Sequence, residues 1–436
     1  LQTLHETYLG HTRWASVGAI NEINCHPVNN HRIDIDAVER GGIHALVRDF
    51  PRYGKGAWSI SAALNGDIDN YLELRERLEN GRKVIHPDIT TDTKIIPMLV
   101  EHHLAGGETL EEAFRKSVAA FEGSHAIALL SDIDPGRVYL GQKGSGQSIY
   151  VGFFDGGYMF ASEVYGLVEV TPSFVKMDGE SMRQSGDPAT QGQIFILDAA
   201  GTGGIGDIRA LSYDGYPLHL GEEHIQTAQI TTRDIDRGDH QHYLIKEILD
   251  APSSIRKTLL GKYRIEDAAR VVFNLDETVV DAATRRMISA GEIRNIFVVG
   301  QGTAAVAAGA VAEAMSRYLR GAPVFVQARK ATDLSGFLLD DDMSDTLVIA
   351  ITQSGTTTDT NRAVTLARSR GARLIAIVNR RQSDITTKVH GVFYTSDGRD
   401  VEMSVASTKA FYSQIAAGYV LALFFAQLTR TLDDGC

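Results

Sequence analysis

The second half of the chain alternates short apolar, β-branched runs with helical segments, and this alternation sets its fold class. Strands are expected at 296–299, 324–327, 346–351, 374–379 and 392–394, with helices between them and a long helix from about residue 406. Repeated strand–helix units predict a parallel sheet covered by helices on both faces. Ligands of such sheets bind beyond the carboxyl ends of the strands, at the point where the strand order reverses. The loops after these strands are therefore the first candidates for a site.

The loop at 352–360 is rich in hydroxyl groups and lies between the strand 346–351 and a helical segment at 362–370. Backbone N–H and side-chain O–H groups at a helix N-terminus form a ready site for phosphate. The loop contains no lysine, so it is not a nucleotide P-loop, and hydroxyls without lysine suit a sugar phosphate. A Ser/Thr-rich surface turn with an ordinary helix cap is the alternative for this loop taken alone.

Two further loops have the same character. Gly302 in the first allows close approach of a ligand, and Thr303 places a hydroxyl at the start of a helix. A dinucleotide fingerprint is disfavoured there, because residues 306–308 lack its third glycine. The other loop, 402–411, opens the last helix. If the three loops converge, they form one pocket for a phosphate and hydroxyls.

The first half predicts a layered α+β domain that combines runs of strands with pairs of helices. Strands are expected at 60–64, 126–130, 138–141, 149–153, 158–161 and 193–197, and helices at 71–79, 94–103 and 110–121. Turn signals such as Asn65-Gly66 separate them. The polar stretch 227–242 is the best linker candidate. The predicted domains are therefore 1–235, a linker with a helical lead-in at 236–290 (helices 243–260 and 277–290), and 291–436.

Composition excludes several classes of protein. The net charge is -12 and no Lys/Arg-rich run is present, which argues against a nucleic-acid partner. The two cysteines, Cys25 and Cys436, offer neither a disulfide framework nor metal-ligand spacing, so no metal site and a reducing, cytoplasmic location are expected. The longest apolar run, at 416–426, contains Gly418 and predicts a buried helix rather than a membrane span.

The motifs of both halves together resemble the glutamine–fructose-6-phosphate aminotransferase (glucosamine-6-phosphate synthase) family. In the second half the resemblance is carried by the loops at 300–303, 352–359 and 402–411. In the first half it is carried by four short motifs, at 11–18, 24–27, 65–66 and 91–93. The motifs occur in the family's order along most of the chain, and residues 238–258 resemble its inter-domain segment.

The resemblance implies a four-layer (αββα) glutaminase domain of the Ntn-hydrolase type, followed by the first α/β sugar isomerase (SIS) domain. The implied reaction moves the amide nitrogen of glutamine onto fructose 6-phosphate, giving glucosamine 6-phosphate and glutamate. It implies no cofactor, and a homodimer formed through the SIS domain.

Six residues match the family's glutaminase site. Arg13 would pair with the α-carboxylate of glutamine and Asp92 with its α-ammonium group. The remaining four are Asn65 and Gly66 for the oxyanion hole, Trp14 beside the ammonia path, and Ser16 in the glutamine-binding motif. Val17 departs from the family, which has a histidine there.

Four of these glutaminase residues also have a plainer interpretation. Arg13 suits a surface ion pair, Asp92 suits a helix N-cap, and Asn65-Gly66 is a common tight-turn dipeptide. His26, which precedes Pro27, is expected to be structural rather than a base.

Seven residues match the family's sugar-phosphate site: Thr303, Thr352, Gln353, Ser354 and Thr357 at the phosphate end, and Val405 and Ser407 at the sugar. Ala304, Thr352 and Gln301 depart from the family's usual serine, serine and cysteine.

The chain is expected to be a fragment, truncated at both ends, of a longer protein. The given sequence begins at Leu1, and the family's N-terminal nucleophilic cysteine and second SIS domain are expected to lie outside this fragment. Cys25 is expected to be a small buried residue rather than a substitute nucleophile. The fragment alone is expected to be inactive, and an insert around 33–52 indicates a divergent subgroup.

Two other functions compete with this interpretation. A sugar-phosphate-binding or regulatory protein with a degenerate glutaminase domain is the main alternative. An amidophosphoribosyltransferase is disfavoured, because the second half lacks an acidic phosphoribosyl-pyrophosphate loop.

Overall fold

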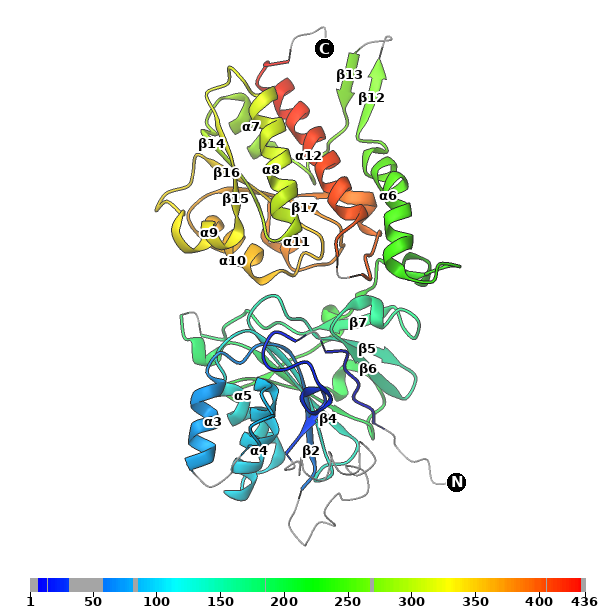
Figure 1. The fold of residues 1–436 in the computed structure, drawn as a ribbon, viewed down its shortest axis with the longest axis vertical. Helices are drawn as coiled ribbons and strands as arrows, with labels where there is room; N and C mark the ends of the chain where they lie inside the picture. Colours follow the sequence, from blue (N-terminus) through cyan, green and yellow to red (C-terminus); the bar gives the residue numbers. More distant parts are fainter. Residues whose placement is uncertain are drawn as a thin grey trace. The chain divides into compact units, whose positions relative to one another are not determined.

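The computed structural model describes residues 7–13, 15–30, 58–80, 85–184, 186–266, 270–404 and 406–432. The insert around 33–52, Trp14, Val405 and Cys436 therefore lie outside the described residues. Contacts divide the chain into two compact units, Leu1–Ala228 and Gln229–Cys436. Each unit has its own sheets and cores (Figure 1).

The first unit is built on two antiparallel sheets. The larger has the order β1-β2-β3-β4-β8-β9-β10 and the smaller the order β11-β7-β5-β6. The strands of the larger sheet are β1 (Val28–Asn29), β2 (Ile60–Gly66), β3 (His125–Ser131), β4 (Arg137–Lys143), β8 (Gln193–Asp198), β9 (Arg209–Ser212) and β10 (Pro217–Leu218). Those of the smaller sheet are β5 (Tyr150–Phe154), β6 (Gly157–Ala161), β7 (Ser173–Lys176) and β11 (Gln226–Thr227).

The described part of the first unit forms three layers. Helices α3 (Tyr71–Asn80), α4 (Ile95–Ala105) and α5 (Leu110–Ala119) pack on one face of the larger sheet around a single apolar cluster. The other face packs against the smaller sheet in a second cluster. Beyond the smaller sheet, Tyr150 and Phe174 pack against the segment around a 3-10 turn, Val164–Gly166. The expected four-layer fold has a helical layer on this side of the smaller sheet. Among the described residues this position holds a 3-10 turn instead.

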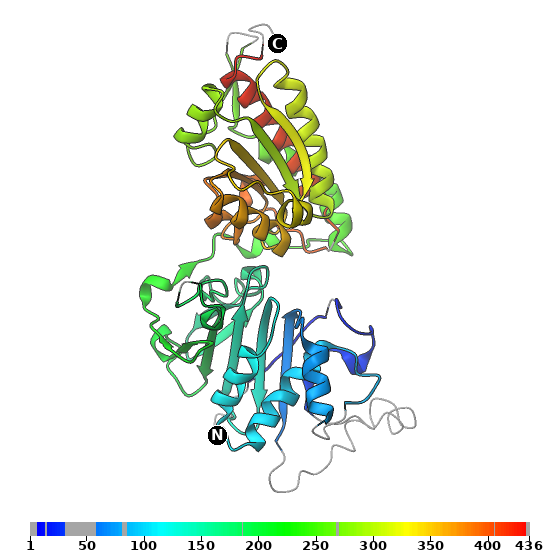
Figure 2. The ribbon, with the colours of Figure 1, turned by 90° about the vertical axis from the view of Figure 1, so that its left-hand side faces the viewer.

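The second unit contains a five-stranded parallel sheet of order β15-β14-β16-β17-β18, with helices on both faces (Figure 2). The strands are β14 (Asn295–Gly300), β15 (Phe325–Lys330), β16 (Thr346–Thr352), β17 (Arg373–Val378) and β18 (Gly391–Tyr394). The helices are α6 (Tyr243–Leu259), α7 (Ala282–Ser289), α8 (Thr303–Tyr318), α9 (Ala331–Phe337), α10 (Thr358–Ser369), α11 (Ile385–Lys388) and α12 (Lys409–Leu428). A hairpin of β12 (Tyr263–Glu266) and β13 (Arg270–Phe273) follows α6.

Successive side chains of the parallel strands enter different cores. Ile296 and Val298 pack with α7, α8 and α12, whereas Phe297 and Val299 pack with α9 and α10. Because both faces are covered, the strands read as continuous apolar runs. This confirms the expected parallel sheet flanked by helices.

Three expected elements have different bounds. The helix expected at 277–290 begins at Ala282, because the Asp281 carboxylate accepts a hydrogen bond from Thr284 N (2.7 Å) and caps the helix there. The last helix begins at Lys409 rather than near 406. The strand expected at 324–327 extends to Lys330 along its pairing with β14. The predicted domain boundaries at 235 and 290 remain predictions.

Helix α12 is long and apolar enough to cross a membrane by length and composition. More than half of its most apolar window is buried inside the unit, where it packs against α6 and α8. Gly418 lies at the crossing with α8, because a Cβ atom there would meet Val311 Cγ2 at 2.2 Å. The helix therefore has the packing of a core helix.

Candidate functional sites

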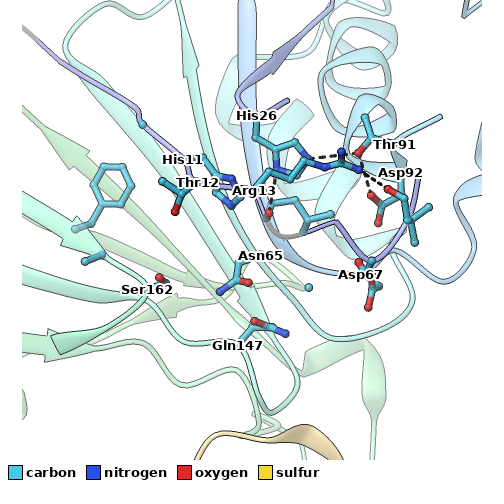
Figure 3. A pocket seen from close by; sticks show the side chains of 17 residues that line it. His11, Thr12, Arg13, His26, Asn65, Asp67, Thr91, Asp92, Gln147 and Ser162 are labelled. Carbon is cyan, nitrogen blue, oxygen red and sulfur yellow. Dashed lines mark hydrogen bonds between the residues drawn. The ribbon is translucent and has the colours of Figure 1, made fainter. Parts of the chain in front are cut away.

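A cavity of about 500 Å³ in the first unit brings together the glutaminase residues that the sequence predicts. Arg13, Asn65 and Asp92 line it (Figure 3), as do Ser16 and Gly66. They come from the segment before β1, from the end of β2 and from the turn before α4. Trp14 lies outside the described residues. The other five predicted residues therefore share one site.

Arg13 holds the loop that forms one wall of this cavity. Its guanidinium donates hydrogen bonds to Val17 O (2.5 Å) and Ala19 O (2.8 Å). Gly18, between these residues, has φ +88, and a Cβ atom there would lie 2.7 Å from the backbone of Thr90. No carboxylate pairs with Arg13 in the described ranges. The surface ion pair considered for Arg13 is therefore not observed.

Asp92 is a buried carboxylate without a cationic partner in the described part of the chain. Its oxygens accept hydrogen bonds from Ile68 N (3.0 Å) and Thr93 N (2.8 Å). Burial raises the pKa of Asp92, and Asp67 adds to the rise, while the two backbone donors oppose it. The N-cap of the local 3-10 turn is Thr91, so the N-cap interpretation of Asp92 is wrong. A buried carboxylate whose negative charge is not balanced by a cation suits an ammonium group.

Asn65 and Gly66 are the last two residues of β2 and not a turn. Asn65 pairs with Ala126 and Gly66 with His125 in the antiparallel ladder, so the interpretation of this dipeptide as a turn is wrong. Gly66 has φ +107, and a Cβ atom there would lie 2.2 Å from Ser124 O. The position therefore requires glycine, because it combines a left-handed backbone with a close backbone approach.

Replacing Gly66 with alanine is expected to lower the free energy of unfolding of the first unit by at least about 2 kcal/mol. The reason is the clash with Ser124 O added to the strain of positive φ. Gly156→Ala is the matched control, because Gly156 has φ +77 but nothing within 4 Å of its Cβ position. Urea unfolding followed by circular dichroism measures both variants, and equal losses would contradict the role of the close approach.

The rings of His11 and His26 lie near Arg13 in a tilted arrangement, with ring centroids 4.7 Å apart. His26 Nδ1 lies 3.1 Å from Leu64 O and Nε2 lies 2.8 Å from Thr93 Oγ1. Burial, then the nearby His11 and Arg13, lowers the pKa of His26 to about 4. His26 also lines the cavity, so its structural role stays a prediction.

The cavity also contains residues that the sequence did not single out. Asp67, Gln147 and Ser162 line it, and Ser16 Oγ donates a hydrogen bond to Asp67 Oδ1. Asp67 directly follows Asn65-Gly66, whereas Gln147 and Ser162 lie in loops without a recognisable motif. Cys25 is exposed and does not line the cavity, so the expectation that it is buried is wrong.

In the second unit, two of the predicted loops leave neighbouring strands at the point where the strand order reverses. β14 pairs with β15 on one side and β16 on the other. Thr303 is the first residue of α8, after Gly302 at φ +59. Thr352 ends β16, and Thr357 is the N-cap of α10. Both loops therefore occupy the position at which such sheets bind ligands.

The loop after β16 is held by its own hydroxyls. Thr352 Oγ1 accepts a hydrogen bond from Gly355 N (3.1 Å), and Ser354 Oγ accepts from Thr356 N (3.2 Å). Gln353 Nε2 is buried and has no hydrogen-bond partner in the part of the chain that the structure describes. A buried unsatisfied donor costs stability, so Gln353 offers a group that a ligand oxygen would satisfy.

The loop before α12 is organised by two buried glutamates. Glu402 accepts hydrogen bonds from Ser407 Oγ (3.2 Å) and Thr408 N (2.8 Å). Glu247, on α6, accepts hydrogen bonds from Met403 N (2.6 Å) and Ser404 N (3.3 Å). Val405, between them, lies outside the described residues. That this loop joins the other two in one pocket remains a prediction.

Comparisons with known proteins match both halves. Residues 292–424 match the SIS domain family, and residues 52–169 match a glutamine amidotransferase domain family. The glutamine–fructose-6-phosphate aminotransferase (isomerizing) of Clostridium tetani is 29% identical over 427 residues, covering 98% of this chain and 59% of that protein. Its counterpart in Corynebacterium diphtheriae is 30% identical over 423 residues, covering 96% and 57%.

A solved structure, the C-terminal domain of glucosamine-fructose-6-phosphate aminotransferase from Francisella tularensis, is 24% identical. It covers 46% of this chain and 51% of that one, with a TM-score of 0.38. The chain thus spans less than two thirds of the length of the curated relatives it matches.

Proposed function

We propose that this chain, which joins a glutamine amidotransferase domain to a SIS domain, belongs to an enzyme that transfers the amide nitrogen of glutamine to fructose 6-phosphate. The products are glucosamine 6-phosphate and glutamate. The observation that carries the proposal is the shared cavity of Arg13, Asn65, Gly66 and Asp92. The activity is proposed for the whole protein, because the chain spans 59% of its relative from Clostridium tetani.

The first unit would bind glutamine by its two charged ends. Asp92 would accept the α-ammonium group, and Arg13 would direct its remaining N–H donors to the α-carboxylate. The Asn65 amide and Gly66 N–H would stabilise the oxyanion of the tetrahedral intermediate. Ser16 and Trp14 would complete this site. The two packed sheets and the helix layer would then belong to a four-layer Ntn-hydrolase-type domain.

The second unit would hold the sugar phosphate at the switch point of the parallel sheet. Thr303, Ser354 and Thr357 would donate hydroxyl hydrogens to the phosphate oxygens, together with N–H groups at the helix starts. Thr352 and the buried Gln353 amide would complete this end.

The opposite end of the sugar would contact Val405 and Ser407. No cofactor takes part in this scheme. A homodimer formed through the SIS domain and a cytoplasmic location complete the proposal.

The test supplies the full-length gene product with fructose 6-phosphate and glutamine labelled with ¹⁵N in the amide. We expect mass spectrometry to detect ¹⁵N in glucosamine 6-phosphate. In Ser354→Ala we expect the KM for fructose 6-phosphate to rise about tenfold, because about one hydrogen bond to a charged group is lost. Labelled ammonia without labelled amino sugar would contradict the proposed transfer. Sugar-phosphate binding without any glutamine turnover would instead support a regulatory protein with a degenerate glutaminase domain.

A further inference from the structure

The second unit has another cavity, of about 660 Å³, on the β15 side of the loop at 300–303. It is lined by the start of α8, the end of β15 and α9, including Gln301, Gly302, Gln327, Arg329, Lys330 and Asp333. None of the seven residues predicted for the sugar-phosphate site lines it. It therefore lies next to the edge strand β15 and adjoins the loop at 300–303, but it contains none of those seven residues.

Arg329 is the central group of this cavity. Its guanidinium carbon lies 4.3 Å from the centre of the buried Phe297 ring. Its Nε is buried and has no hydrogen-bond partner, and no carboxylate pairs with it in the ranges that the structure describes. Stacking on an aromatic ring fixes the plane of a guanidinium, so its donors are preorganised for an anion. Arg329 is therefore available to donate hydrogen bonds to an anionic ligand in this cavity.

The surrounding groups define the rest of the ligand. Lys330 adds a second positive charge beside Arg329, and Gly302 precedes the N-terminus of the 16-residue helix α8. Two cations and a helix N-terminus match a dianion better than a single carboxylate. Among the described residues Gln301 Oε1 is a buried acceptor without a partner, and Asp333 is an exposed carboxylate that also lines the cavity. The Gln301 oxygen favours a ligand with a hydroxyl or N–H donor, and Asp333 can accept a second such bond.

We propose that this cavity binds a hydroxylated phosphate ester. Its phosphate would lie on Arg329 and Lys330, and its hydroxyls would donate hydrogen bonds to Gln301 and Asp333. The volume of about 660 Å³ leaves room for a sugar-sized body beside the phosphate. The inference does not depend on the reaction proposed above, because Arg329, Lys330, Gln301 and Asp333 have no role in that reaction.

Isothermal titration calorimetry with glucose 6-phosphate tests the proposal on four proteins: wild type, Arg329→Gln, Ser354→Ala and Arg317→Gln. Arg317 is the matched control, since it also stacks on a ring (Tyr318, 5.9 Å) but does not line the cavity. We expect a binding event that is at least tenfold weaker in Arg329→Gln and unchanged in Arg317→Gln. Binding of the same sugar phosphate at the loop 352–357 is a second event, which only Ser354→Ala weakens. Unfolding curves establish that the variants are folded.

Two results would overturn the proposal. One is that glucose 6-phosphate binds to Arg329→Gln as it does to wild type. The other is that malate, a hydroxylated dicarboxylate, competes as well as the phosphate ester does, which would assign the cavity to carboxylates. Arg329→Lys keeps the charge but loses the planar fork, so its affinity should lie between those of wild type and Arg329→Gln.

Discussion

Asp92→Asn should weaken the binding of L-glutamine by about 100-fold, which corresponds to about 2.7 kcal/mol. Asp92 is buried and already accepts two backbone hydrogen bonds, yet no described side chain neutralises it. In the proposed complex the substrate's ammonium would be its charge partner. Asparagine preserves the shape and removes the charge. Calorimetry on this chain measures the difference without requiring turnover.

The controls separate charge recognition from a loss of structure. Glutaramate is glutamine without its α-amino group, so its affinity should differ less than about threefold between wild type and Asp92→Asn. Asp67→Asn removes the other carboxylate of the same cavity and should weaken glutamine binding far less. If Asp92→Asn lowers the affinities for glutamine and glutaramate equally, Asp92 supports the fold of the cavity and does not bind the ammonium group.

Lys409→Met is expected to destabilise the second unit by about 3–5 kcal/mol, the usual effect of removing one partner from a buried ion pair. Lys409 is 1% exposed and its Nζ lies 2.7 Å from Asp400 Oδ1 and 3.6 Å from Asp250 Oδ2. Methionine fills the space of the lysine stem and leaves the Asp400 carboxylate buried without its cation. Hydrogen exchange of α12 peptides, followed by mass spectrometry, reports the loss.

Lys246→Met is the matched control. Lys246 contacts the same Asp250 at 2.7 Å, but both side chains are partly exposed, so the expected loss is at most about 1 kcal/mol. Similar losses in the two variants would contradict the role of burial at Lys409.

The pair at Lys409 also predicts a dependence on pH. Burial acts to raise the pKa of Asp400, but the Lys409 ammonium and hydrogen bonds outweigh it and hold the pKa below its usual value. The stabilisation is therefore fully present above about pH 4 and lost as the pH falls through the lowered pKa. The difference between wild type and Lys409→Met should shrink in that acidic range.

The sequence was sufficient for the parts of the fold that depend on local periodicity. The apolar runs of β14, β16 and β17 are buried on both faces, so periodicity alone indicated a parallel sheet. The exact start of α7 required Asp281, whose capping bond competes with an extension of the helix toward 277. Side-chain capping is decided by a single residue, and periodicity does not report it.

The candidate glutaminase site was predictable only where residues belong to short motifs. Arg13, Asn65 and Asp92 stand in such motifs, and the cavity brings them together. Gln147 enters it from the loop between β4 and β5, and Ser162 from the segment between β6 and β7, and no local pattern marks either residue. The sequence also could not separate a tight turn from a strand end at Asn65-Gly66, because glycine at positive φ serves both.

The buried Glu247 joins two segments that are far apart in the order of synthesis. Its carboxylate receives the N–H groups of Met403 and Ser404, 156 and 157 residues later. Contacts of such sequence separation form late, because the intervening chain must be closed first. During translation, the Glu247 carboxylate therefore lacks these two N–H partners until nearly the whole second unit has left the ribosome. A nascent chain that pauses before α12 would leave the sheet face that α12 covers exposed, and in this interval the unit is most prone to misfold.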